Sequence, residues 1–255
     1  MARILNILFA IAVLGLMIYL SVGIDDIKNQ KINFISFDGN YHLTKEQYLA
    51  FANLYDKNLF ENLSVQIIKD RVEKHPYIKH ADVRYEGNNK VSVRVTEKSF
   101  ESLIVDSSAQ FIITDKLQVL PVLDQTKKID YPVISNPVLR DGIKSLSIQK
   151  KNNDILTASK IISAVKLINM DLYNSLSSVD MQNGDDIILY FSNLNYPLII
   201  GRGGEIQKVV YFNSFWKYLK GKEINNYMEY VDLRFAGHVY LGIKEQNSQE
   251  AQKKS

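Results

Sequence analysis

Residues 4–23 form a continuous apolar run without a single charge, preceded by Arg3 and followed by two aspartates. A run of about 20 apolar residues has the length that an α-helix needs to cross the hydrocarbon core of a bilayer. Outside a membrane, a helix that is apolar on every side would have to lie inside a large protein core. The sequence therefore predicts a single N-terminal transmembrane helix over residues 4–24.

The charges that flank this run indicate its orientation. Positive charge favours the cytoplasmic side of a span, and here Arg3 precedes the run while Asp25 and Asp26 follow it. We expect residues 1–3 to be a minimal cytoplasmic tail and the chain from Asp25 onward to be extracytoplasmic. The alternative is a signal peptide cleaved near residues 21–23, although the apolar region of such peptides is usually shorter, roughly 7–15 residues. Both hypotheses export the rest of the chain.

The composition of the chain excludes several kinds of chemistry. There is no cysteine, so disulfide frameworks, thiolate nucleophiles and zinc fingers are not available. The net charge is only +3, from 31 basic and 28 acidic residues, which gives no reason to expect nucleic acid as a partner. The histidines show no spacing typical of metal ligands: His42, His75, His80 and His238. We expect no cofactor, no metal and no small-molecule substrate.

The exported part begins with a segment, residues 32–97, whose pattern predicts the order strand, helix, helix, strand, strand. Residues 32–37 alternate as in a strand, and residues 81–96 alternate on both sides of a Gly-Asn-Asn turn. Such a hairpin buries one face and exposes the other. We expect the two helices to cover the buried face.

The two helices of this segment have clear end signals. Thr44 and Gln47 stand at the spacing of a capping box, which predicts that a helix begins there. A second helix is predicted to begin at Ser64 and to end before Pro76, because the residue before a proline avoids the α conformation.

Residues 99–243 predict a mixed α/β domain with a mainly antiparallel sheet. Two amphipathic helices are expected, near residues 155–168 and 205–219. Short strands are expected at residues 101–105, 111–114, 117–122, 133–134, 179–182, 187–191 and 198–200, with two more within 227–243. Residues 244–255 are polar and without periodicity, and we expect them to be disordered.

No motif in this region predicts an enzyme. The glycine-rich stretch at residues 201–204 precedes a helix but lacks the ending of a phosphate-binding loop, so we expect an ordinary strand-to-helix turn. Three Ser-x-x-Lys spacings occur without the partner motifs that a penicillin-binding or β-lactamase site needs. The acidic pair Asp185-Asp186 is expected to be solvated at a turn.

The last strands, within residues 227–243, are a candidate interaction site. A terminal strand beside a polar tail is often the edge of a sheet, and such an edge can accept a strand from a partner. The alternative is an edge protected by Arg234, His238 and Lys244. The pattern leaves both possibilities open.

Several motifs of the chain are similar to those of one family. They lie at residues 37–40, 43–47, 58–60, 76–84, 91–97 and 230–235. With the span in front, they resemble the FtsQ/DivIB cell-division proteins, in which a POTRA domain follows a single membrane anchor. The chain departs from the family at residues 85–87 and 98–100, where members often carry prolines, and its cytoplasmic tail is far shorter than in many members.

The resemblance implies an α+β architecture with a POTRA domain over residues 32–98 and a β domain over residues 99–243. It implies a non-enzymatic divisome scaffold in the inner (cytoplasmic) membrane, located at the division septum, which links early and late division proteins. In the family, a strand of FtsB, paired with FtsL (DivIC with FtsL in Gram-positive relatives), adds to the end of the β domain, and the POTRA domain contacts other divisome components. Carried over, the partner-binding residues are Arg234, Phe235, Gly242 and Ile243.

Two other hypotheses remain open. POTRA modules also occur in outer-membrane assembly and secretion components, but a membrane barrel needs longer alternating strands than those predicted here. A secreted enzyme released by signal cleavage is the third possibility, and a mature N-terminus at Ile24 would favour it.

Overall fold

A computed structural model describes residues 9, 11–19, 32–56, 60, 63–106, 109–139 and 142–244 of the 255-residue chain. Residues 11–19 are helical. The rest of the predicted span, the predicted tail at residues 1–3 and nearly all of the predicted tail at 244–255 lie outside the described residues. Among the helices that the structure describes, none combines the length and the hydrophobicity needed to cross a membrane.

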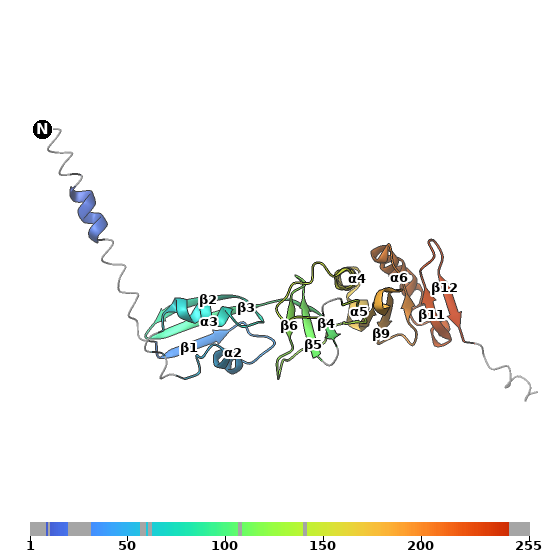
Figure 1. The fold of residues 1–255 in the computed structure, drawn as a ribbon, viewed down its shortest axis with the longest axis horizontal. Coiled ribbons are helices and arrows are strands. Elements are labelled where there is room, and N and C mark those ends of the chain that lie inside the picture. Colours follow the sequence, from blue (N-terminus) through green and yellow to red (C-terminus); the bar gives the residue numbers. More distant parts are fainter. Residues whose placement is uncertain are drawn as a thin grey trace, which may run out of the picture. The chain divides into compact units, whose positions relative to one another are not determined.

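The chain divides into two units, Met1–Glu97 and Lys98–Ser255, here called unit 1 and unit 2. Unit 1 contains a sheet in the order β1-β3-β2 (Figure 1). Strand β1 (Phe34–Asp38) runs parallel to β3 (Lys90–Glu97), and β2 (Ile78–Gly87) is antiparallel to β3. Alternate side chains on all three strands are buried, so the predicted hairpin with one buried face is confirmed.

Helices α2 (Lys45–Phe51) and α3 (Val65–Glu73) complete unit 1. The capping box of α2 is confirmed: the Thr44 hydroxyl accepts from the Gln47 N–H, and the Gln47 side chain accepts from the Thr44 N–H. Ser64 caps α3 by accepting from the Ile67 N–H. These local hydrogen bonds satisfy N–H groups that have no partner within a helix, which is why both helices begin where the sequence predicts.

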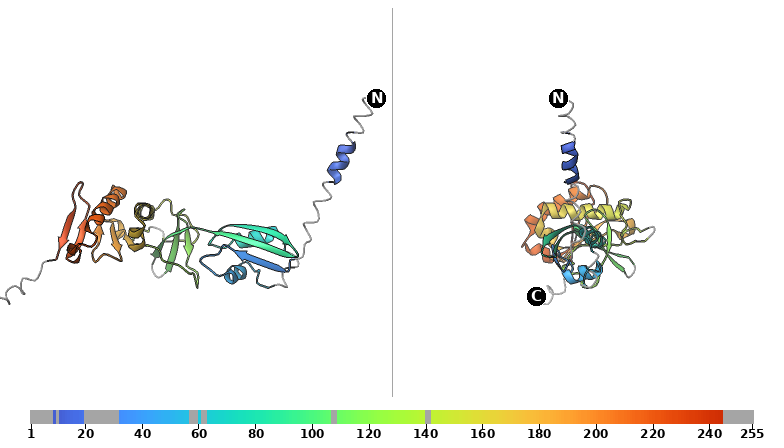
Figure 2. Two further views of the ribbon diagram at one scale, coloured as in Figure 1. Left: turned by 180° about the vertical axis from the view of Figure 1, so that it is seen from behind. Right: turned by 90° about the vertical axis from the view of Figure 1, so that its left-hand side faces the viewer.

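Unit 2 is built on one mixed sheet (Figures 1 and 2). Its strands are β4 (Phe100–Asp106), β5 (Ala109–Thr114), β6 (Val119–Pro121), β7 (Val133–Ser135), β8 (Leu176–Asp180), β9 (Ile188–Phe191), β10 (Leu198–Ile199), β11 (Met228–Asp232) and β12 (Tyr240–Ile243). Their spatial order is β12-β11-β10-β9-β8-β7-β4-β5-β6. Among these described strands, five neighbouring pairs are antiparallel and three are parallel. The α+β class with a large mixed sheet is confirmed.

Helices α4 (Asn153–Ile168) and α6 (Glu205–Leu219) lie side by side in both views (Figures 1 and 2). The apolar stripes predicted for them are buried in one core with the strands. A short helix, α5 (Met170–Ser175), was not predicted. Its six residues are too few for a recognisable stripe. Asn169 ends α4 and caps α5, which leads directly into β8.

The two ends of the unit 2 sheet differ in how they are covered. At the β6 end, the Val119 N–H donates to Ser147 O at 2.9 Å and the Leu146 N–H donates to Val119 O at 2.8 Å. At the other end, β12 pairs with β11, and no described residue pairs with its outer side. An uncovered edge presents free N–H and C=O groups, and among the described strands the outer side of β12 is such an edge.

Candidate functional site

The outer edge of β12 follows from its register with β11. Tyr230 lies opposite Gly242, and the Lys244 N–H donates to Tyr227 O at 2.8 Å. Successive backbone groups of a strand point to alternate sides. The N–H and C=O groups of Leu241 and Ile243 therefore face away from β11. These groups are the ones that a partner strand would meet.

Arg234 is held in a fixed position just after β11. Its Nε donates to both carboxylate oxygens of Asp232 at 3.0 Å, and Nη2 donates to Asp232 Oδ2 at 2.6 Å. Its Nη1 donates to Asp186 Oδ2 at 2.7 Å. Hydrogen bonds from Arg234 hold the pKa of Asp232 below its ordinary value, although burial of that carboxyl would raise it. Arg234 thus serves as a clamp between strand β11 and the loop before β9.

Gly201 makes room for this clamp. Its φ is +58°, and a Cβ at this position would lie 2.8 Å from Arg234 Cγ. A glycine allows both the left-handed backbone and the close approach of the arginine stem. The stretch at residues 201–204 is the strand-to-helix turn that the sequence predicted, with Gly204 at the start of α6. The sequence led us to expect that Asp186 is solvated, but in the structure its carboxylate is paired with Arg234.

Phe235 and Ile243 are exposed on the surface beside this edge, each at 54%. The Phe235 ring packs edge-to-face on Tyr240, with ring centroids 5.1 Å apart, and the Arg234 guanidinium lies 5.9 Å from the Phe235 ring centroid. Gly242 is buried beneath the Tyr230 ring. Exposed aromatic side chains at a sheet edge supply the apolar contacts that accompany strand addition.

The structure therefore brings the four predicted residues to one end of unit 2, in different roles. Arg234 is an internal clamp, Gly242 provides space, and Phe235 and Ile243 are open to solvent. The sequence analysis did not identify Tyr240, which belongs to the same surface. It also did not identify Asp232 and Asp186, which hold Arg234 in place. Strand alternation after Gly237 could have identified Tyr240, whereas no local pattern links Asp186 to a residue 48 positions later.

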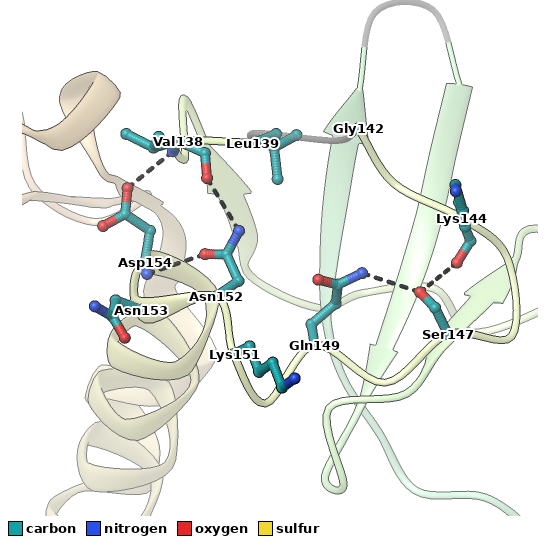
Figure 3. A pocket seen from close by; sticks show the side chains of 10 residues that line it. All are labelled: Val138, Leu139, Gly142, Lys144, Ser147, Gln149, Lys151, Asn152, Asn153 and Asp154. Carbon is teal, nitrogen blue, oxygen red and sulfur yellow. Dashed lines mark hydrogen bonds between the residues drawn. The ribbon is translucent and has the colours of Figure 1, made fainter.

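A polar hollow at the start of α4, with a volume of about 640 Å³, is a second place to look for chemistry (Figure 3). Asn152 Nδ2 donates to Val138 O at 3.0 Å, and Asp154 Oδ2 accepts from the Val138 N–H at 2.9 Å. Gln149 donates to Ser147 Oγ. These groups bond to one another and cap the helix, so we assign no ligand to the hollow. Among the described residues, no group of three or more His, Asp or Glu could hold a metal ion.

Comparison with known proteins identifies the first part of the chain. Residues 30–98 match the family model of the POTRA domain, FtsQ-type. The class is therefore that of proteins with an FtsQ-type POTRA domain, here followed by a mixed-sheet unit.

Relatives that align over most of the chain are named as cell-division proteins. The Cell division protein FtsQ of Syntrophotalea carbinolica is 23% identical over 220 residues, which cover 84% of this chain and 74% of the relative. The Cell division protein DivIB of Clostridium acetobutylicum is 23% identical over 218 residues, covering 84% of this chain and 83% of the relative. The Cell division protein FtsQ of Geotalea daltonii is 19% identical over 203 residues, covering 78% and 70%. The resemblance to the FtsQ/DivIB family is confirmed.

Proposed function

We propose that this chain is a non-enzymatic scaffold of the cell-division machinery, which binds an FtsB/FtsL-type coiled-coil pair by strand addition to β12. It would be anchored by a single span at residues 4–24 in the inner (cytoplasmic) membrane, with a POTRA domain at residues 32–98 and a β domain at residues 99–243 outside the cytoplasm at the septum. The POTRA domain would contact other divisome components.

The free edge of β12 is the observation that carries this proposal. The opposite edge of the sheet is covered by residues 146–149, whereas the outward groups of Leu241 and Ile243 have no partner strand among the described residues. The exposed Phe235 and Tyr240 flank that edge. Names of relatives that refer to cell division support the biological setting.

The test distinguishes the contribution of the Ile243 backbone N–H to partner binding from that of the Ile243 side chain. In Ile243→Pro the outward N–H is lost and the ring blocks the edge, but no hydrogen bond to β11 is removed. In Ile243→Ala the outward N–H is kept. The full chain in detergent is immobilised and its capture of a purified FtsB/FtsL-type pair is measured. We expect Ile243→Pro to lose capture and Ile243→Ala to keep most of it.

Unchanged capture by Ile243→Pro would contradict strand addition at this edge. Phe235→Ala should weaken capture, since truncating a central interface aromatic typically costs about 1–3 kcal/mol. Tyr211→Ala, which removes an exposed aromatic from α6, is the matched control and should bind as the wild type does. Determination of the N-terminus of the protein in membranes tests the anchor, because cleavage near residue 23 would exclude it.

A further inference from the structure

A small hollow lies between β4 and α4, in a different part of unit 2 from the proposed binding edge. In the sheet order, five strands separate β4 from β12. The hollow has a volume of about 340 Å³, at the lower end of the roughly 300–1,000 Å³ typical of ligand sites. Its polar lining is Glu101, Asp115, Ser159, Lys160 and Ser163, and its apolar lining includes Leu117, Leu156, Leu167 and Ile206.

Glu101 is directed into this hollow by an irregularity in the sheet. Phe100 pairs with Thr114 and Ser102 pairs with Ile113, so Glu101 is the extra residue of a β-bulge. A bulge re-aims one side chain away from the regular alternation. The Glu101 carboxylate accepts a hydrogen bond from the Ser163 hydroxyl of α4.

Glu101 carries a charge that no nearby cation neutralises. No basic side chain among the described residues lies within ion-pair distance of Glu101 or Asp115. Lys166 lowers the pKa of Glu101 only through the weakest of the causes acting on it, and its Nζ lies 5.3 Å from the Tyr173 ring centroid. Burial, the largest cause, and the Asp115 carboxylate raise the pKa of Glu101. The hydroxyls of Ser163 and Ser159 act in the opposite direction but do not cancel this rise. The site therefore favours the arrival of a positive charge.

The buried hydroxyl of Ser159 is a second indication that a polar ligand binds in this hollow. Its side chain lines the hollow one helical turn before Ser163 and is only 5% exposed. Its hydroxyl is close enough to the Glu101 carboxyl to lower the pKa of that group, but Oγ makes no hydrogen bond of regular geometry with any described group. A buried polar atom without a partner costs free energy, and a donor from a ligand would remove that cost.

We propose that this hollow binds the arginine side chain of a protein partner, with the guanidinium on Glu101 and Ser159. The planar fork of an arginine offers several donors at once, to a carboxylate and to a hydroxyl oxygen. Its aliphatic stem fits the apolar wall, where Leu167 is 87% exposed and Ile206 is 42% exposed. A metal ion is a poorer match, because no cluster of three metal-binding side chains occurs among the described residues. Lys160 also lines the hollow, but its side chain is exposed and makes no ion pair with Glu101 or Asp115.

The test uses two peptides that differ at one group, the charged guanidinium of arginine or the uncharged urea of citrulline. Acetyl-Leu-Arg-Leu-amide is titrated into the full chain in detergent, with methyl-labelled leucine and isoleucine, and is compared with acetyl-Leu-citrulline-Leu-amide. The methyl groups of Leu117, Leu156, Leu167 and Ile206 report on the hollow. We expect saturable shifts with the arginine peptide and about tenfold weaker binding of the citrulline peptide.

Two variants make the result specific. Glu101→Gln should abolish the preference for arginine over citrulline, whereas Glu223→Gln, which makes the same change in charge at an exposed site, should keep it. Ser159→Ala should weaken arginine binding with little loss of stability, because its hydroxyl makes no hydrogen bond of regular geometry with a described group in the free protein. Equal affinity for the two peptides, an unchanged preference in Glu101→Gln, or the absence of any saturable shift would each overturn the proposal. None of these variants alters β12, so strand addition is tested separately.

Discussion

The ring of Tyr230 occupies the space that a side chain at Gly242 would need. The two residues face each other across the β11–β12 pair, and a Cβ on Gly242 would lie 2.3 Å from Tyr230 Cε1. An aromatic ring that covers a cross-strand glycine protects the backbone of an edge strand. Here it also requires that position 242 have no side chain, so the edge proposed for binding depends on this pair.

We predict that Gly242→Ala destabilises unit 2, because the new methyl group would overlap the Tyr230 ring, with a loss of about 1–3 kcal/mol as for other overpacked sites. Tyr230→Ala in the same chain should recover much of this loss. Urea unfolding followed by fluorescence of Trp216, the single tryptophan and part of α6, measures both. Additive losses in the double variant would show that the ring does not cause the effect.

Glu97 is expected to stabilise unit 1 above acidic pH. Its carboxylate accepts from the Tyr48 hydroxyl at 2.6 Å and the Tyr41 N–H at 2.8 Å, and it lies 2.5 Å from His42 Nδ1. Burial alone would raise the pKa of Glu97, but these hydrogen bonds hold it below its ordinary value. A lowered pKa stabilises the fold above the unfolded value of about 4.3, and this contribution is lost as the pH falls further.

Glu97→Gln should therefore lower the stability of unit 1 at pH 7 by about 2 kcal/mol and reduce its dependence on pH below about 4.3. Hydrogen exchange of peptides from β1, β2 and β3 measures unit 1 without interference from unit 2. Glu46→Gln, on the exposed side of α2, is the control. If exchange in Glu97→Gln matched the control at every pH, the hydrogen-bond argument would fail.

Arg202 joins three segments of unit 2 through its guanidinium. It donates to Asp154 Oδ1 at 2.9 Å, to Asp185 O at 2.7 Å and to Met181 O at 3.2 Å. Lysine carries a compact charge and cannot reproduce the planar fork. We predict that Arg202→Lys costs about 1–2 kcal/mol, measured by urea unfolding with Trp216 fluorescence.

Arg84→Lys is the matched comparison for this effect. Arg84 is paired with Asp82, but its side chain is 77% exposed. A surface pair of this kind contributes little to stability. Because Arg84 lies in β2 of unit 1, Arg84→Lys is followed by hydrogen exchange of β2 peptides and should match the wild type. A loss in Arg202→Lys no larger than in Arg84→Lys would contradict the proposed role of the fork.

The Asp232–Arg234 pair predicts a second acid-dependent contribution, located in unit 2. Since the pKa of Asp232 is lowered in the folded state, the stabilisation is present above its unfolded value of about 4 and disappears as the pH falls below it. Asp232→Asn should be less stable than the wild type at neutral pH and should respond less to acid. Trp216 fluorescence between neutral pH and pH 3 checks this, with Asp130→Asn as the exposed control.

Elements with local signals were predictable from the sequence. Thr44 and Ser64 start their helices through hydrogen bonds within three residues, and the hairpin of β2 and β3 follows from alternation alone. The bulge at Glu101 was not predictable, because a register shift depends on the partner strand. The same holds for the Asp186–Arg234 pair, since the parallel pairing of β10 with β11 joins distant parts of the chain.

The candidate binding residues were placed by family resemblance, and their physical roles emerged only from the fold. The resemblance assigned Arg234 to partner binding, and in the fold it is bound by two aspartates. The resemblance assigned Gly242 the same role, and in the fold this position leaves space for an aromatic ring. Both roles arise from neighbours that periodicity does not specify.

The unequal ends of the unit 2 sheet limit the stoichiometry of any complex formed by strand pairing. The β6 end is occupied by residues 146–149, so, within the part of the sheet that the structure describes, a chain that accepts a strand at β12 has no second open edge to offer. Growth of a continuous sheet through many copies would need two open ends in each copy. Pairing at this sheet is therefore expected to stop after one strand per chain, which makes the assembly finite.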